Sequence, residues 1–393
     1  MFFTIKHFMK NQRTIILQLF LFIVTLATTS LSGAEWMFGR PFDLPFFKIE
    51  NPLGWNEFWQ GFQFSIPFLG ILTVHEFGHY FAAKRHNIKV TLPYYIPLWL
   101  GFGQTIGTLG AFIRIKEFIR SRVKYFDIGI AGPLAGFVVA LGVLWYGFAT
   151  LPTLDYIFKI HPEYRKFGMG FARVVYANQS KTGNILLGDN LLFSFFKNYV
   201  ADPARLPPPQ EIMHYPLLLA GYLALFFTSL NLIPIGQLDG GHVLYGLIGS
   251  KKFKIIAPIL FFIFITYAGL GSYRPNEFAI ADNGAFWHKI GSLGLYTLFL
   301  QICFSRITDE NPLTSWMLAL LSVALQFGIS LFFPAVEGYS GFLVFGFLLG
   351  RILGVHHPPT EDNQPLNRNR QILGWLTLLI FVLCFSPKPF IIL

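Results

Sequence analysis

The segment His75-Glu76-Phe77-Gly78-His79 has the residue types and the spacing needed to hold a metal ion and to hydrolyse a bond beside it. Residues four apart lie on one face of a helix, so the imidazoles of His75 and His79 can reach a single zinc ion. Glu76 lies on the flank of that face, where its carboxylate can take a proton from water and later deliver it to a leaving amine. The pattern predicts metal-assisted hydrolysis; the alternative is a hydrogen-bonded polar cluster that joins helices.

Two histidines do not complete a catalytic zinc site, which generally has three protein ligands and a fourth position for water. The best candidate for the third ligand is Asp239, within the sequence Asn-Leu-Ile-Pro-Ile-Gly-Gln-Leu-Asp-Gly-Gly-His at 231–242. An aspartate offsets more of the ion's charge at a site of low dielectric than a neutral imidazole does. His242 is the alternative ligand, and the alternative role of Asp239 is that of a turn residue at the end of a helix. We expect one Zn²⁺ per chain.

The H-E-F-G-H segment followed by N-x-x-P-x-x-x-x-D-G resembles the site-2 protease family of intramembrane zinc metalloproteases. The resemblance implies that His75, His79 and Asp239 bind zinc and that Glu76 is the catalytic base. It also implies a catalytic role for Asn231 in holding the substrate or the oxyanion; the alternative for this residue is an interhelical hydrogen bond.

The resemblance covers roughly residues 58–250, including the linking segments 107–111 and 126–136. Many bacterial members carry a PDZ domain between the catalytic helices. Residues 151–213 are too short for one and show no such pattern. The chain therefore resembles the members that lack a PDZ domain.

The composition predicts that these residues lie on membrane helices. Of 393 residues, 53% are hydrophobic and 13% are charged, against about 25% charged in soluble proteins. An apolar helix of roughly 20 residues can cross a bilayer. The apolar stretches are 14–29, 58–83, 128–149, 215–232, 255–270, 316–333 and 372–385, with weaker ones at 293–304 and 342–353. We expect an all-α polytopic membrane protein with about seven to nine membrane segments.

The formal net charge of +10 could suggest nucleic acid, but the positions of the basic residues favour a membrane orientation. The Lys and Arg clusters fall on one side of a consistent threading, as expected for cytoplasmic loops. They are Lys6 to Arg13, Lys84 to Lys89, Arg120 to Lys124, Lys251 to Lys254 and Arg368 to Arg370. We therefore expect no nucleic-acid partner, a cytoplasmic N-terminus and a bacterial inner (cytoplasmic) membrane.

Residues 91–116 are apolar but are interrupted by two prolines and four glycines, which a plain spanning helix tolerates poorly. Irregular backbone at membrane depth must be shielded by protein or line a wet cavity. We therefore expect a re-entrant, strand-like segment near the active site; the alternative is a loop in the headgroup region. An unwound substrate could pair with its exposed edge.

Three regions follow from these patterns. Residues 1–57 hold an N-terminal transmembrane segment and an outer loop, residues 58–250 the catalytic core, and residues 251–393 additional helices. Within the core, the outer loop 151–213 could cap the outer face or bind a partner.

The sequence thus predicts an intramembrane zinc metalloendopeptidase that acts on transmembrane proteins or peptides in the lipid bilayer. An upstream protease that makes a first cut is a further partner compatible with the resemblance. The alternatives are a membrane metal-ion transporter, whose ligands should be spread along several spans, and a catalytically silent relative that binds membrane proteins.

Overall fold

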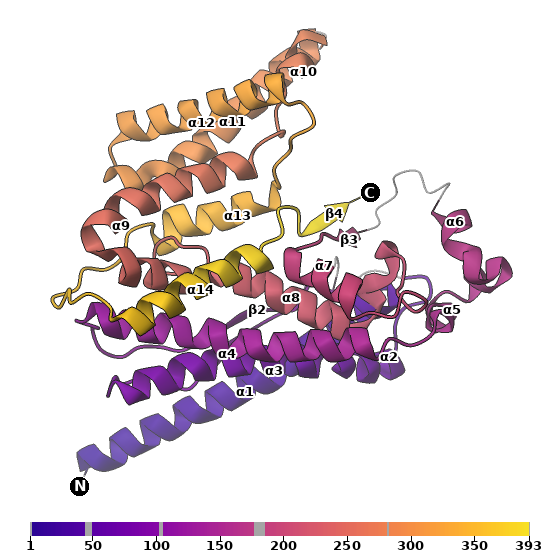
Figure 1. The fold of residues 1–393 in the computed structure, drawn as a ribbon, viewed down its shortest axis with the longest axis horizontal. Helices are drawn as coiled ribbons and strands as arrows, with labels where there is room; N and C mark the ends of the chain where they lie inside the picture. Colours follow the sequence, from indigo (N-terminus) through magenta and orange to yellow (C-terminus); the bar gives the residue numbers. More distant parts are fainter. Residues whose placement is uncertain (1, 44–48, 102–104, 177–184, 281–282, 393) are drawn as a thin grey trace. The chain divides into compact units, whose positions relative to one another are not determined.

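The computed structural model describes residues 2–43, 49–101, 105–176, 185–280 and 283–392. This described part of the chain is mostly helical, with two small two-stranded sheets (Figure 1). It divides into two compact units. The first comprises residues 1–118, 131–230 and 380–393, and the second comprises residues 119–130 and 231–379.

The first unit contains the predicted catalytic helix and most of the segment between the two motifs. Its elements are α1 (Phe2–Phe38), α2 (Trp55–Gln60), α3 (Phe62–Arg85), β1 (Tyr94–Leu98), β2 (Gly107–Phe112), most of α4 (Arg122–Ala149), α5 (Ile157–Ile160), α6 (Phe171–Val175), β3 (Ile185–Leu187), α7 (Leu191–Tyr199), α8 (Pro216–Asn231) and β4 (Phe390–Ile392), with 3₁₀ turns η1 (Leu154–Tyr156), η2 (Pro162–Gly170) and η3 (Pro209–His214).

The segment 91–116 forms an antiparallel hairpin, β1 paired with β2, so its strand-like character is confirmed. Residues 102–104 of that prediction lie outside the described residues. Several side chains of α1 bond to the hairpin segment. Gln18 Nε2 donates to the carbonyl of Leu92 at 2.6 Å, Thr28 Oγ1 to that of Gly107 at 2.7 Å, and Trp36 Nε1 to that of Thr105 at 2.9 Å. These bonds satisfy backbone groups of an irregular segment, as a setting with little water requires.

Residues 151–176 and 185–215 contribute to the hydrophobic core of the first unit; residues 177–184 of the predicted outer loop lie outside the described residues. The short helices of 151–176 and 185–215 bury Phe158, Phe171, Phe193 and Phe196 in one cluster with Tyr222 of α8. A second sheet pairs β3 of this segment with β4, so residues 185–187 meet residues 390–392. This segment is therefore fixed to the helices and is more than a connection between them.

The second unit consists of the start of α4, then α9 (Asp239–Ala268), α10 (Pro275–Ile280), α11 (Asn283–Phe304), α12 (Pro312–Phe332), α13 (Gly341–Phe347) and most of α14 (Arg368–Cys384), with the short turns η4 (Ser305–Thr308) and η5 (Leu348–Leu353). A kink divides α9 at Gly249, whose φ of +78° suits glycine.

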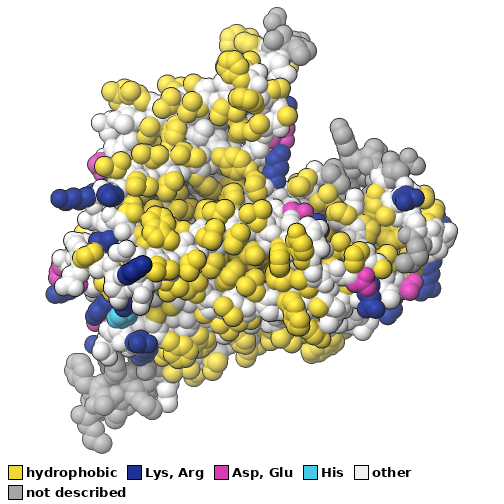
Figure 2. Space-filling model, viewed as in Figure 1, with side chains coloured by type: hydrophobic (Ala, Val, Ile, Leu, Met, Phe, Trp, Pro, Cys, Tyr) yellow, Lys and Arg dark blue, Asp and Glu magenta, His cyan; other side chains and the backbone are white. Residues whose placement is uncertain are grey.

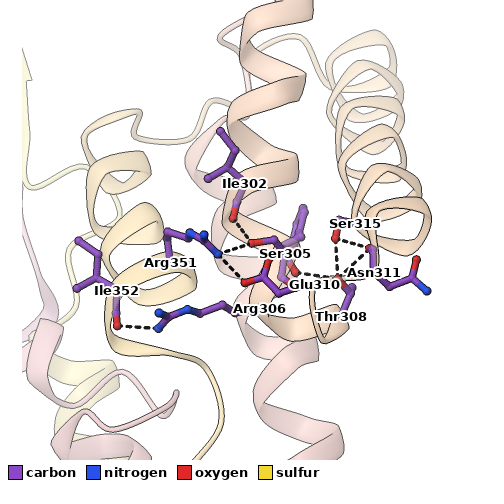
Figure 3. Close-up of polar contacts among 10 residues, drawn as sticks. Ile302, Ser305, Arg306, Thr308, Glu310, Asn311, Ser315, Arg351 and Ile352 are labelled. Carbon is purple, nitrogen blue, oxygen red and sulfur yellow. Dashed lines mark hydrogen bonds and ion pairs between the residues drawn. The ribbon is translucent and has the colours of Figure 1, made fainter.

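Polar side chains join the ends of three elements in the second unit (Figure 3). Arg351 of η5 donates to Ser305 Oγ at 3.1 Å and to Glu310 Oε1 at 2.6 Å. Thr308 and Ser315 hydroxyls lie 2.6 Å apart and connect η4 to α12. Arg351 thus bridges the junction between α11 and α12, where its charge is paired.

Among the described residues, the helices that are long and apolar enough to cross a membrane are four: Gln12–Phe38, Arg122–Ala149, Gly284–Thr308 and Pro312–Phe332. Each of the nine apolar stretches coincides largely with helix, which confirms the mostly helical, multi-pass character. Hydrophobic side chains cover much of the visible surface (Figure 2). Phe20 of α1 and Phe332 of α12 are among the exposed apolar side chains of the protein. Such an apolar exterior suits lipid contact.

Candidate active site

The H-E-x-x-H residues lie in the middle of α3, as predicted, and their side chains are buried. His75, Glu76 and His79 are 6%, 5% and 7% exposed. The Nε2 atoms of His75 and His79 are 3.0 Å apart, and Glu76 Oε1 lies 4.0 Å from His75 Nε2. The two imidazoles therefore converge on one point while the carboxylate stands beside them.

This arrangement fits a zinc ion. Zinc–nitrogen bonds of about 2.0–2.1 Å place two tetrahedral ligands roughly 3.3 Å apart, close to the separation of the two imidazole nitrogens. Two buried neutral imidazoles and an acidic group in one helical turn are costly in an apolar setting unless they are paired.

Small residues let α4 approach the histidines closely. A Cβ atom at Gly78 of α3 would lie 2.5 Å from the carbonyl oxygen of Ala131, and one at Gly136 would lie 3.0 Å from the Cβ of His75. Gly78 is thus needed between the two histidines, because any larger residue would push α4 away. The sequence showed these glycines, but their packing role requires the structure.

The hairpin reaches α3 just before the H-E-x-x-H turn. The Tyr95 hydroxyl of β1 lies 2.8 Å from the hydroxyl of Thr73. The ring of Tyr95 also packs edge-on against Phe22 of α1, with centroids 5.0 Å apart. The hydrogen bond between Tyr95 and Thr73 positions strand β1 beside the buried His75, Glu76 and His79. The sequence did not predict that Thr73 or Tyr95 contributes to the site.

The second motif forms a tight turn in the second unit. Asn231 ends α8 and Asp239 begins α9. Gly240 has no room for a Cβ against the carbonyl of Leu232, and Gly241 lies against Gly236. The turn therefore folds back on itself, so the residues that follow Asn231 and Asp239 touch, and the glycines permit this approach.

His242, the alternative ligand, belongs to a ring cluster in the second unit. Its Nδ1 lies 2.8 Å from Nε2 of His357, and its ring stacks on Tyr125 with centroids 5.1 Å apart. His357 in turn stacks on Tyr245. One nitrogen of His242 is thus engaged with a neighbouring imidazole.

Comparisons with known proteins agree with this reading. The profile of Peptidase family M50 matches residues 63–268, which include both motifs. The chain is 27% identical over 260 residues to "Probable zinc metalloprotease EGY1, chloroplastic" of Arabidopsis thaliana, covering 65% of this chain and 40% of that protein. It is 30% identical over 183 residues to "Probable zinc metalloprotease EGY2, chloroplastic" of Oryza sativa subsp. indica, covering 46% and 28%.

A third relative, "Probable zinc metallopeptidase EGY3, chloroplastic" of Arabidopsis thaliana, is 24% identical over 225 residues, covering 54% of this chain and 34% of that protein. The matched region thus spans less than half the length of each of these relatives. No solved structure matches the chain.

Proposed function

Because the chain belongs to peptidase family M50, we propose that it is an intramembrane zinc metalloendopeptidase that cleaves membrane-spanning or membrane-tethered proteins. The observation that carries the proposal is the buried pair of imidazole nitrogens, 3.0 Å apart, with Glu76 beside them. The names of the relatives, which describe those proteins as zinc metalloproteases, support the same activity.

We assign His75, His79 and Asp239 as the zinc ligands. The family match includes Asp239, and a carboxylate offsets the charge of the ion. His242 is the weaker candidate because its Nδ1 is engaged with His357. Bound zinc would polarise the scissile carbonyl and make water more acidic.

Glu76 is the proton carrier in this proposal. Its carboxylate accepts a proton from the attacking water and returns it to the leaving amine. Burial of Glu76 excludes bulk water, which strengthens its interaction with nearby charge. Asn231 remains a candidate hydrogen-bond donor to the substrate or to the oxyanion.

We further propose that β1 and β2 receive the substrate at membrane depth. A peptide bond must be reached in an extended chain, and strand addition supplies backbone hydrogen bonds without regard to sequence. The contact of Tyr95 with Thr73 supports this role because it ties the hairpin to α3 next to the predicted metal ligands.

We propose that the chain has seven to nine membrane segments and lies in a bacterial inner membrane. The nine apolar stretches that form helices support the number of membrane segments. The relatives are named as chloroplastic, which describes those proteins. Transmembrane substrates and an upstream protease that makes a first cut belong to the same proposal.

The test uses the purified full chain and its Glu76→Gln variant, incubated with a panel of single-span membrane proteins. We expect Glu76→Gln to keep its zinc and to lose cleavage by about 10²–10⁴-fold, the usual contribution of acid–base catalysis. Glu50→Gln, which alters an exposed carboxylate, should cleave normally. Zinc is counted by mass spectrometry of the metal, and products are identified by peptide mass spectrometry.

Normal cleavage by Glu76→Gln would refute the role of this carboxylate. Zinc uptake into liposomes that depends on His75 would favour a transporter. Stable capture of membrane proteins without cleavage by the unaltered chain would favour a silent binding protein.

A further inference from the structure

A second group of metal-binding side chains lies in the segment between α4 and α8 of the first unit. It consists of His161, Glu211 and His214. His214 Nε2 lies 3.4 Å from His161 Nε2 and 3.4 Å from Glu211 Oε2, and the remaining distance, from His161 Nε2 to Glu211 Oε2, is 3.9 Å. Ligands in a tetrahedral zinc site are roughly 3.3–3.4 Å apart, so these three atoms are spaced as ligands would be.

Each of the three side chains is fixed from behind by a further contact. His214 Nδ1 lies 2.7 Å from the carbonyl oxygen of Met37, at the end of α1. His161 Nδ1 lies 3.2 Å from Glu163 Oε1. The Tyr176 hydroxyl donates to Glu211 Oε1. Metal-binding histidines and carboxylates are held in this way by backbone carbonyls, carboxylates and hydroxyls.

The ring of His161 is also held by stacking. Tyr164 lies parallel to it, with an angle of 15° between the rings and 4.6 Å between their centroids. This contact keeps Nε2 of His161 turned toward His214 and Glu211. Stacking thus fixes the orientation of the His161 ring even though this side chain is partly exposed to solvent.

These outer contacts determine which ring nitrogens carry hydrogen in the neutral imidazoles. A carbonyl and a carboxylate only accept hydrogen bonds, so the hydrogen of each neutral ring is on Nδ1. Both Nε2 atoms then present a lone pair to one another and to a carboxylate oxygen. Three acceptors that face each other repel unless a cation lies between them.

Burial makes such a cation more important. The side chains of Glu211 and His214 are 1% and 7% exposed, and that of His161 is 24% exposed. Glu211 Oε2 is buried without a hydrogen-bond partner. Among the residues that the structure describes, the ion-pair partners of Glu211 are His161 and His214. A buried carboxylate without a cation is strongly destabilising.

We propose that His161, Glu211 and His214 bind one zinc-type divalent cation, separate from the ion assigned to His75 and His79. Two imidazoles and one carboxylate are a typical ligand set for zinc. Because His214 is bonded to the carbonyl of Met37, the ion would hold α5 and η3 together against the end of α1. The proposed role is structural, on the face predicted to lie opposite the basic loops.

The test is the zinc content of the purified full chain in detergent after gel filtration in buffer with micromolar zinc. We expect two zinc ions in the unaltered protein and one in both His161→Ala and Glu211→Gln. His75→Ala should lose the other ion and keep this one. His356→Ala is the matched control, because His356 is exposed and lies in neither group, and it should keep both.

The design separates this site from the proposed protease. If the site at His75 and His79 held no metal, the unaltered chain would carry one ion and His161→Ala none. If His161→Ala and Glu211→Gln kept as much zinc as the unaltered chain, the second site would be refuted.

A variant at an exposed residue tests the site without the risk that the protein fails to fold. Glu163 is 59% exposed, and Glu163→Gln should leave the fold intact. It should weaken zinc binding by about tenfold, because it replaces the charged acceptor of the His161 Nδ1 hydrogen with a neutral amide oxygen. Binding is measured by competition with a chelator on the His75→Ala background, where one site remains. An unchanged affinity would contradict the assigned role of Glu163. If added zinc left the melting temperature of His75→Ala unchanged, the structural role would fail.

Discussion

Gly132 of α4 lies directly against the imidazole of His79 and leaves no space for a Cβ atom there. The ring of His79 is therefore positioned by a backbone surface of the neighbouring helix. A rigid surface behind a ligand restricts its side-chain angles more than a flexible side chain would.

Gly132→Ala should therefore displace His79 and reduce both zinc content and cleavage. We expect at least a tenfold loss of cleavage, because a shift of about 1 Å in a catalytic group costs up to 10²-fold. Gly142→Ala, in the same helix, is the control. A Cβ at Gly142 meets open space, so this variant should retain activity. Equal activity of the two variants would show that the contact with His79 does not matter.

The choice between Asp239 and His242 as third ligand can be decided by metal analysis. Asp239→Ala should lower the zinc content at the site of His75 and His79, because it removes a ligand and leaves the ion with excess positive charge. His242→Ala should keep the ion and disturb only the contacts with His357 and Tyr125. If the two results were reversed, the ligand would be His242.

Two glycines in β2 offer a matched test of how the hairpin packs on α1. Both have positive φ, +85° at Gly107 and +107° at Gly110, so alanine at either should cost about 1–2 kcal/mol in backbone strain. Only Gly107 is crowded, by the backbone of Thr28 and Thr29. The steric clash in Gly107→Ala should thus lower the stability of the folded protein by a further amount of about 1–3 kcal/mol relative to Gly110→Ala.

The measurement for this pair is the half-life of each purified variant at a fixed elevated temperature. A shorter half-life for Gly107→Ala than for Gly110→Ala is expected. Similar half-lives would mean that α1 moves away from the hairpin at little cost.

In the second unit, Arg370 of α14 forms a bidentate ion pair with Asp127 of α4. Nε and Nη2 donate to the two carboxylate oxygens at 2.7 and 2.8 Å. A double-mutant cycle with Asp127→Asn and Arg370→Gln should give a coupling energy of about 1 kcal/mol, since both side chains are partly exposed. The coupling is measured by chemical unfolding in detergent micelles.

A nearby exposed pair supplies the comparison. Arg120 and Glu361 lie 3.6 Å apart, with side chains 73% and 65% exposed. Their coupling should be close to zero, because solvent screens exposed charges. A larger coupling for this pair than for Asp127 and Arg370 would contradict the importance of bidentate geometry and partial burial.

The sequence predicted the parts of the fold that depend on local patterns. Long apolar runs mark helices, and the helical spacing of His75 and His79 predicts that both imidazoles face the same way. The prolines and glycines of 91–116 exclude a plain helix, and the hairpin is the result. In each case the physical cause lies within a few residues along the chain.

Contacts between distant residues could not be predicted in this way. His161 and Glu211 are 50 residues apart and belong to no motif, so only the fold brings them together. The short helices of 151–215 are too brief for a clear hydrophobic period, although Phe193 and Phe196 are buried.

The pairing of β3 with β4 has a consequence for biosynthesis. Residues 185–187 are synthesised well before residues 390–392, and nearly all of the second unit is synthesised between them. A nascent chain that does not yet contain residues 389–392 would leave the edge of β3 unpaired. It would also lack the carbonyl of Pro389, which accepts a hydrogen bond from Tyr222 at 2.6 Å. The unit that holds His75 and His79 is thus completed only after translation has passed through the other unit.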